Sequence, residues 1–195
     1  MDAGIGTTRI GLALVQAVIA WEFLSSGVTK LVHGDFPGGL AATLHERLGA
    51  APGWYADFLR DTVIPHAVAF GWAIELGEVA VALLLLAGAA GALTGRRRAA
   101  AAATALGAFA GFVLALAFGL SDGAGFFVLV APDSFDEGVS LDALAAWLQV
   151  VLLASALAEL VDEPAIRFGW LRGIRSTLGR CTSSPLRVLS AVRAR

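Results

Sequence analysis

Four apolar blocks, each long enough to cross a lipid bilayer as a helix, constrain this chain more than any other feature of its sequence. They cover residues 10–31, 67–93, 99–120 and 141–161. An α-helix needs about 20 apolar residues to cross a hydrocarbon core of about 30 Å. Because 57% of the residues are hydrophobic and only 15% are charged, the chain has too little charge to cover a soluble domain. The sequence predicts an all-α fold, a polytopic membrane four-helix bundle over residues 1–162.

The distribution of Lys and Arg predicts the orientation of this bundle. Arg9, the arginines at 96–98 and the seven arginines of residues 163–195 fall on one side, whereas only three cations fall on the other. The basic side of a membrane protein usually faces the cytoplasm. We therefore expect both termini inside, with the two loops of residues 32–66 and 121–140 outside.

Both outer loops contain apolar stretches shorter than a span. In "PGGLAATLHERLG", Leu40, Leu44 and Leu48 form one stripe of a short helix that ends at Gly49. The stretch "PGWYADFLRDTVIP" follows with aromatic residues of the kind found at lipid head groups. We predict two short interfacial helices here, and interpret "GFFVLVAP" in the second loop as a re-entrant or interfacial segment.

Small residues recur in the second and third spans. Gly91 and Gly95 form a GxxxG pair, which lets two helix backbones approach closely. In the third span small residues recur every four positions, which predicts close packing along one face. This series consists of Ala103, Gly107, Gly111, Ala115 and Gly119.

Residues 163–195 form a basic tail. Ile166, Trp170, Ile174 and Leu178 make an apolar stripe among arginines, which predicts an amphipathic helix on anionic lipid or a docking surface for an acidic cytoplasmic partner. The single cysteine, Cys181, excludes an internal disulfide.

Three carboxylates lie inside spans, where ionisable groups are costly and commonly functional. Glu22, Glu75 and Glu78 all fall about 14–18 Å below the outer surface, at about 1.5 Å per residue. Lys30 is two turns outward from Glu22, and His66 stands at the mouth of the second span. We expect a polar track of these five residues towards mid-membrane.

Carboxylates this close together in a low dielectric cannot all be ionised, so at least one is expected to hold a proton. Such a group suits a proton-coupled quinone site or a proton relay. The structural alternative is that Glu22 and Glu75 pair with Lys30, Ser25 and Ser26 and fix the helices in register.

Other kinds of site lack their motifs. The three histidines do not show the spacing of a zinc site, so no metal is expected. There is no phosphate loop, dinucleotide fingerprint or nucleophile elbow, and the tail lacks the motifs of a nucleic-acid reader.

Two stretches are similar to a known family. "WEFLSSGVTKLVHGDF" resembles the end of the first helix in the DoxX and DoxD group of membrane proteins, and "WAIELGEVAVALLLLAGAAGALTGRRRAAA" resembles its second helix with the basic turn that follows. The similarity covers residues 8–162. Four residues match the charged motif positions of the family: Glu22, Lys30, Glu75 and Glu78.

This resemblance implies a four-helix bundle in the bacterial or archaeal cytoplasmic membrane. DoxD-type members form the membrane part of a thiosulfate:quinone oxidoreductase, with a second subunit called DoxA; other members accompany superoxide-defence or sulfur-transfer proteins, and many have no assigned activity. The outer-side cations that a thiosulfate dianion requires are few, namely Lys30, Arg47 and Arg60, so the resemblance does not fix the substrate.

Two functional hypotheses follow. In the first, the chain is the membrane subunit of a quinone-linked oxidoreductase. Glu22, Lys30, Glu75 and Glu78 are its catalytic residues, and Trp21, Trp72 and His66 bind the quinone. In the second, it is a non-catalytic subunit that anchors a larger respiratory or redox complex. A transporter ranks third, because the two halves show no convincing repeat. Membrane lipid and other protein subunits are the expected partners.

Overall fold

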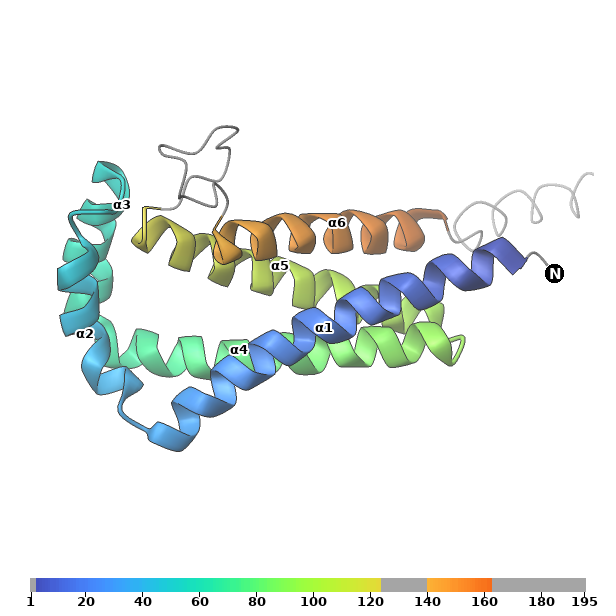
Figure 1. Cartoon of the computed structure of the whole chain (residues 1–195), viewed down its shortest axis with the longest axis horizontal. Coiled ribbons are helices and arrows are strands. Elements are labelled where there is room, and N and C mark those ends of the chain that lie inside the picture. The colour runs from blue at the N-terminus through green and yellow to red at the C-terminus, as the bar shows by residue number, and fades with distance from the viewer. Residues whose placement is uncertain (1–2, 124–139, 163–195) are drawn as a thin grey trace, which may run out of the picture. The chain divides into compact units, whose positions relative to one another are not determined.

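The computed structural model describes residues 3–123 and 140–162, and every regular element within them is a helix. The long helices are α1 (Ala3–His33), α4 (Ala67–Leu93), α5 (Arg97–Ser121) and α6 (Leu141–Asp162). Between α1 and α4 the chain forms α2 (Phe36–Arg47), α3 (Gly53–Phe58), a π-helical turn (Leu59–Val63) and a 3-10 turn (Ile64–His66). In Figure 1, α2 and α3 lie at one end of the long helices, which we call the α2 end.

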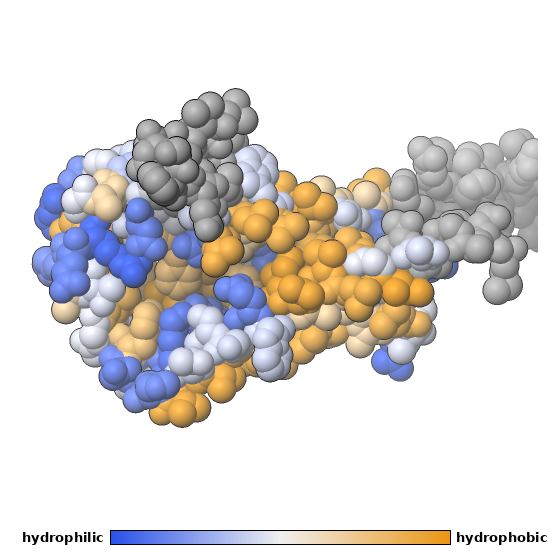
Figure 2. Space-filling model, in the orientation of Figure 1, coloured by the Kyte–Doolittle hydropathy of each residue, from blue (hydrophilic) through white to orange (hydrophobic). Residues whose placement is uncertain are grey.

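Four stretches of helix are long and apolar enough to cross a membrane, as predicted. They are Arg9–His33, Gly53–Leu93, Arg97–Ser121 and Leu141–Val161. Their outward side chains suit lipid, since Val18, Leu83 and Val151 are all exposed. Figure 2 shows hydrophobic residues over the long helices and polar residues gathered at the α2 end. The all-α prediction with four candidate spans is therefore confirmed.

The four long helices share one hydrophobic core. Each helix contributes at least one buried residue to this core, because the helices of a bundle pack their inward-facing apolar side chains against one another. We call this cluster the apolar layer, because it fills the middle of the bundle. Its buried members are Ile19, Ala20, Phe23, Val81, Ala82, Leu85, Ala108 and Leu152.

A second cluster attaches α2 and α3 to the bundle. Leu40 and Leu44 of the predicted leucine stripe are buried in it together with Tyr55 and Leu59. The hydroxyl of Tyr55 also donates a hydrogen bond of 3.1 Å to the backbone oxygen of Ala117 in α5. The α2 end is thus fixed to the long helices by apolar contacts and a hydrogen bond.

Small residues bring α4 and α5 together. A Cβ atom built on Gly107 would lie 3.0 Å from the Cβ of Leu84, and one on Gly91 would lie 2.9 Å from the Cβ of Ala100. The close packing predicted for the third span is present at Gly107.

The interpretation of Gly91 and Gly95 as a packing pair is wrong, because Gly95 follows the end of α4 with a φ of 82° and has no neighbour within 4 Å of a built Cβ. Its role is to reverse the chain, since a positive φ favours glycine.

Gly71 and Gly77 of α4 provide a matched pair for testing this packing. A Cβ on Gly71 would lie 2.5 Å from the Cα of Pro37 in α2, whereas one on Gly77 would meet nothing closer than Leu114 at 3.6 Å. We expect Gly71→Ala to lower the free energy of unfolding by about 1–3 kcal/mol, since the backbone of α2 must shift. Gly77→Ala should be neutral or stabilising, because Ala favours the helix by about 1 kcal/mol. Detergent-induced unfolding of both variants measures the difference, and equal stabilities would contradict the packing.

Two predicted features lie outside the described residues. They are the "GFFVLVAP" segment within residues 124–139 and the basic tail of residues 163–195, which includes Cys181. The first unit of the chain is Met1–Leu160, and the domain boundary after residue 162 stays a prediction.

Candidate functional site

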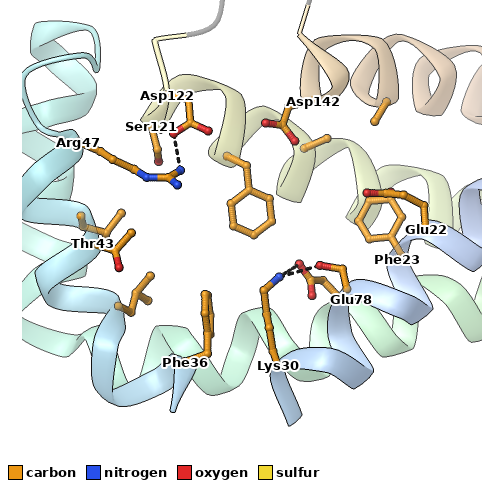
Figure 3. Close-up of a pocket in the computed structure, with 16 residues that line it drawn as sticks. Glu22, Phe23, Lys30, Phe36, Thr43, Arg47, Glu78, Ser121, Asp122 and Asp142 are labelled. Carbon is orange, nitrogen blue, oxygen red and sulfur yellow. Dashed lines mark hydrogen bonds and ion pairs between the residues drawn. The ribbon is translucent and has the colours of Figure 1, made fainter. Parts of the chain in front are cut away.

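A polar cavity of about 290 Å³ lies at the α2 end of the bundle. Side chains from α1, α2, α4, α5 and α6 line it, so all four long helices and α2 contribute to its walls (Figure 3). We call it the polar cavity because it holds six charged residues within an apolar bundle. These residues are Glu22, Lys30, Arg47, Glu78, Asp122 and Asp142.

An ion pair between Lys30 of α1 and Glu78 of α4 forms one wall of the polar cavity. The ammonium of Lys30 donates to Oε1 of Glu78 and, at 2.9 Å, to Oγ of Ser26. It also lies 5.0 Å and 5.1 Å from the ring centroids of Phe36 and Phe118, within the range of a cation–π interaction. The Glu78 side chain is only 2% exposed and that of Lys30 is 20% exposed. Glu78 therefore depends on Lys30 for compensation of its charge.

Gly27 allows this ion pair to form. A Cβ atom at position 27 would lie 2.9 Å from Cγ2 of Val79 and 3.1 Å from the Cβ of Glu78. The absence of a side chain thus lets α1 approach α4 closely, less than one turn from Lys30. The sequence "GVTK" places the small residue and the cation together on one side of α1.

A second ion pair joins Arg47 of α2 to Asp122, the residue that caps the C-terminal end of α5. Both side chains are about two-fifths exposed, at 43% and 42%. Both residues line the polar cavity (Figure 3), and the pair ties α2 to the end of α5. Because it is exposed, its contribution to stability is small.

Two carboxylates of the polar cavity, Glu22 and Asp142, have no hydrogen bond or ion pair with another side chain of the described residues. They come from α1 and α6 and lie on the far side of the cavity from Phe36 in Figure 3. Glu22 is exposed and Asp142 is half-buried. The cavity therefore holds four carboxylates and two cations, a balance that favours neutral or cationic ligands over anions.

The structure brings together three of the four predicted catalytic residues. Glu22, Lys30 and Glu78 line the polar cavity, but Glu75 does not. Glu75 is fully buried, and neither of its carboxyl oxygens has a hydrogen-bond partner in the described part of the chain. The predicted grouping of all three glutamates at one site is thus realised for Glu22 and Glu78 only.

The three residues predicted to bind quinone lie outside the polar cavity. Trp21 and Trp72 are 70% and 48% exposed on the surface of the long helices. His66 precedes α4 and lines a separate groove with Pro37 and Ile64. The expected continuous track from His66 to Glu78 is therefore not formed, because His66 and Lys30 open onto different grooves.

Several cavity residues were not predicted to belong to the site. Asp142 is in the first turn of α6, a common place for an acidic residue in any helix, so it carried no distinctive signal. Phe36 and Phe118 also line the cavity, but a phenylalanine in the sequence cannot be distinguished from an ordinary apolar residue of the core. Arg47 was considered only as one of the few outer-side cations, and Asp122 was not singled out.

Within residues 3–123 and 140–162, no group of three or more His, Cys, Asp or Glu side chains is placed to hold a metal ion. Comparison with known proteins yields no family: no family model, no curated protein and no solved structure matches the chain.

Proposed function

We propose that this chain is the membrane subunit of a quinone-linked oxidoreductase and that the quinone head group binds in the polar cavity. The observation that carries the proposal is the composition of that cavity. A hydrogen-bonding Lys30, two carboxylates without partners and two aromatic rings line one space inside an apolar bundle. A volume of about 290 Å³ is at the lower end of the range of small-ligand sites, which suits a ring rather than an entire lipid-tailed molecule.

The residues of the cavity have complementary roles in this chemistry. Reduction of a quinone to a quinol takes up two electrons and two protons. The ammonium of Lys30 and the hydroxyl of Ser26 donate hydrogen bonds to a ring oxygen and polarise it. Glu22 and Asp142 exchange the protons, since their carboxyl groups face the cavity without a partner. The electrons come from a redox partner, either a reduced sulfur compound or a second protein subunit.

The charge of the polar cavity bears on the substrate. With four carboxylates and two cations, the cavity repels a dianion such as thiosulfate and accepts a neutral quinone. In a DoxD-like complex the sulfur compound would then be oxidised outside this cavity, at a site that a partner subunit completes.

The orientation of the chain belongs to the same proposal. Arg9 and the arginines at 96–98 lie at the end of the bundle opposite α2, and the positive-inside rule puts that end in the cytoplasm. Both termini are then inside, α2 and α3 lie at the outer membrane surface, and the tail binds anionic lipid or an acidic partner. The polar cavity opens on the outer side of a bacterial or archaeal cytoplasmic membrane.

Quinone binding to the purified full chain tests this proposal. Ala145 lines the polar cavity, so Ala145→Phe should fill the space and abolish binding of decylubiquinone while both ion pairs remain. Ala154→Phe is the matched control, because Ala154 is exposed on the same helix and its variant should bind as the wild type does. Equilibrium dialysis against protein in lipid nanodiscs measures both.

A double variant separates catalysis from binding. Glu22→Gln combined with Asp142→Asn should retain quinone binding but lose quinone reduction, because the proton donors are removed. Equal quinone binding by Ala145→Phe and the wild type would show that the cavity is not the site. Absence of quinone from the wild type would favour the accessory-subunit hypothesis, in which the Lys30–Glu78 and Arg47–Asp122 pairs serve only to fix the helices.

A further inference from the structure

Each long helix contributes residues to two cavities. In α1, Lys30, Ser26 and Glu22 line the polar cavity, while Gln16 and Arg9 line a second cavity of about 20 Å³, the small cavity, towards the opposite end. Lys30, Ser26 and Glu22 follow one another every four positions, and Gln16 lies fourteen positions from Lys30 and seven from Arg9, so Gln16 and Arg9 lie on roughly the same side of α1 as Lys30. The other helices repeat this order, with Glu78 and Gly88 in α4, Phe118 and Thr104 in α5, and Asp142 and Glu159 in α6.

The apolar layer lies between the two cavities. Ile19 of α1, Leu85 of α4 and Leu152 of α6 are buried in it, and each lies in sequence between residues that line the polar cavity and residues that line the small cavity. The bundle axis therefore passes from a charged space through an apolar one to a second polar space.

Gln149 interrupts the apolar layer. It is fully buried on α6, and neither its amide nitrogen nor its amide oxygen has a partner in the described residues. At about 1.5 Å per residue it lies about 10 Å along α6 from Asp142 and about 15 Å from Glu159. Gly111 of α5 makes room for it, since a Cβ there would lie 2.8 Å from the side-chain carbon of the Gln149 amide. A buried amide without partners in a protein core usually indicates an ordered water molecule.

Gln16 gives the same indication nearer the other end. Its Nε2 donates to Oγ1 of Thr104 at 3.1 Å, but its Oε1 has no partner among residues 3–123 and 140–162. Both side chains line the small cavity, and a volume of about 20 Å³ accommodates one water molecule. Water in that position would satisfy the free oxygen of Gln16.

We propose that the bundle axis conducts protons between the polar cavity and the small cavity, through water molecules hydrogen-bonded to Gln149 and Gln16. A proton enters at the carboxylates of the polar cavity, moves along the hydrogen-bonded water by the making and breaking of O–H bonds, and leaves at Glu159. One positive charge crosses for each proton. This proposal does not depend on quinone binding.

The apolar layer makes the path selective. Ile19, Leu85 and Leu152 leave no polar lining to replace the water around a sodium or potassium ion, so the loss of hydration excludes such ions. A proton needs only a single file of water molecules. Gln149 supplies the donor and the acceptor that hold such a file in an otherwise apolar environment.

Proton flux into liposomes tests the proposal. The full chain is reconstituted into quinone-free lipid with pyranine inside, and a potassium gradient with valinomycin provides the driving potential. We expect the wild type to acidify the lumen faster than protein-free liposomes do. Gln149→Met, which keeps the shape and removes the polar groups, should lower the flux to the protein-free rate, whereas Gln149→Glu should keep it.

Two further variants and a measurement of sodium flux complete the test. Val151→Leu, at an exposed position of α6, is the control and should conduct like the wild type. Gly111→Ala leaves Gln149 in the chain but removes the space for its amide, so its flux should also fall. Gel filtration of each variant establishes that it folds. Wild-type flux equal to that of empty liposomes, undiminished flux through Gln149→Met, or sodium flux as large as proton flux would each overturn the proposal.

Discussion

Lys30→Met is expected to destabilise the protein by about 3 kcal/mol or more, because removing one partner of a buried ion pair leaves the other charge uncompensated. The remaining partner, Glu78, has a side chain that is almost completely buried, so water cannot replace the lost ammonium. The variant also removes the contacts between the ammonium and the rings of Phe36 and Phe118. Unfolding by sodium dodecyl sulfate in mixed micelles gives the free-energy difference.

Arg47→Met is the matched control for this measurement. It breaks an ion pair whose two side chains are both substantially exposed, so the expected loss is below about 1 kcal/mol. Combining Lys30→Met with Glu78→Leu should recover much of the lost stability, since an apolar pair replaces an ionic one at little cost. Equal losses for the two single variants would contradict the idea that Lys30 compensates the charge of the buried Glu78. No recovery in the double variant would contradict it as well.

Leu85→Ala should cost about 2–5 kcal/mol, the usual effect of emptying a buried leucine site. Leu85 is fully buried in the apolar layer, and the face of α5 at Gly107 packs directly against it. The surrounding helices are already in close contact there, so they cannot collapse to fill the cavity. The same titration in mixed micelles measures the loss.

Leu83→Ala distinguishes packing from a general effect of leucine on α4. Leu83 is exposed on the same helix, and substitutions at such positions usually change stability by about 0.5 kcal/mol or less. If Leu83→Ala were as destabilising as Leu85→Ala, the assigned rotation of α4 would be wrong.

The spans could be predicted because they depend on local properties of the sequence. The second block was predicted over residues 67–93, and α4 has the same bounds, Ala67–Leu93. Length and apolarity suffice for this, since a helix in lipid makes its backbone hydrogen bonds within itself. The GxxxG spacing of Gly91 and Gly95 is also a local property, and it led to a wrong prediction of a packing pair. Spacing alone does not distinguish a glycine in a helix contact from a glycine that ends the helix.

The site was predicted only in part because helix rotation is not a local property. Successive residues of a helix point about 100° apart, so Trp21 and Glu22 face different directions, and the sequence does not say which of them faces the cavity. Glu22 lines it and Trp21 is exposed. Glu75 lies one turn from Gly71, which packs against Pro37 of α2. That contact joins segments more than thirty residues apart, and no periodicity in either segment indicates it.

Only Gly34 and Asp35 separate the end of α1 from the start of α2, and Gly34 makes the turn with a φ of 71°. Phe36, one of the rings beside the Lys30 ammonium, is the first residue of α2. Any displacement of α2 therefore moves a ring away from the ammonium, and Pro37 against Gly71 opposes that displacement. The position of the Lys30 ammonium is therefore coupled to that of α2 through the ring of Phe36.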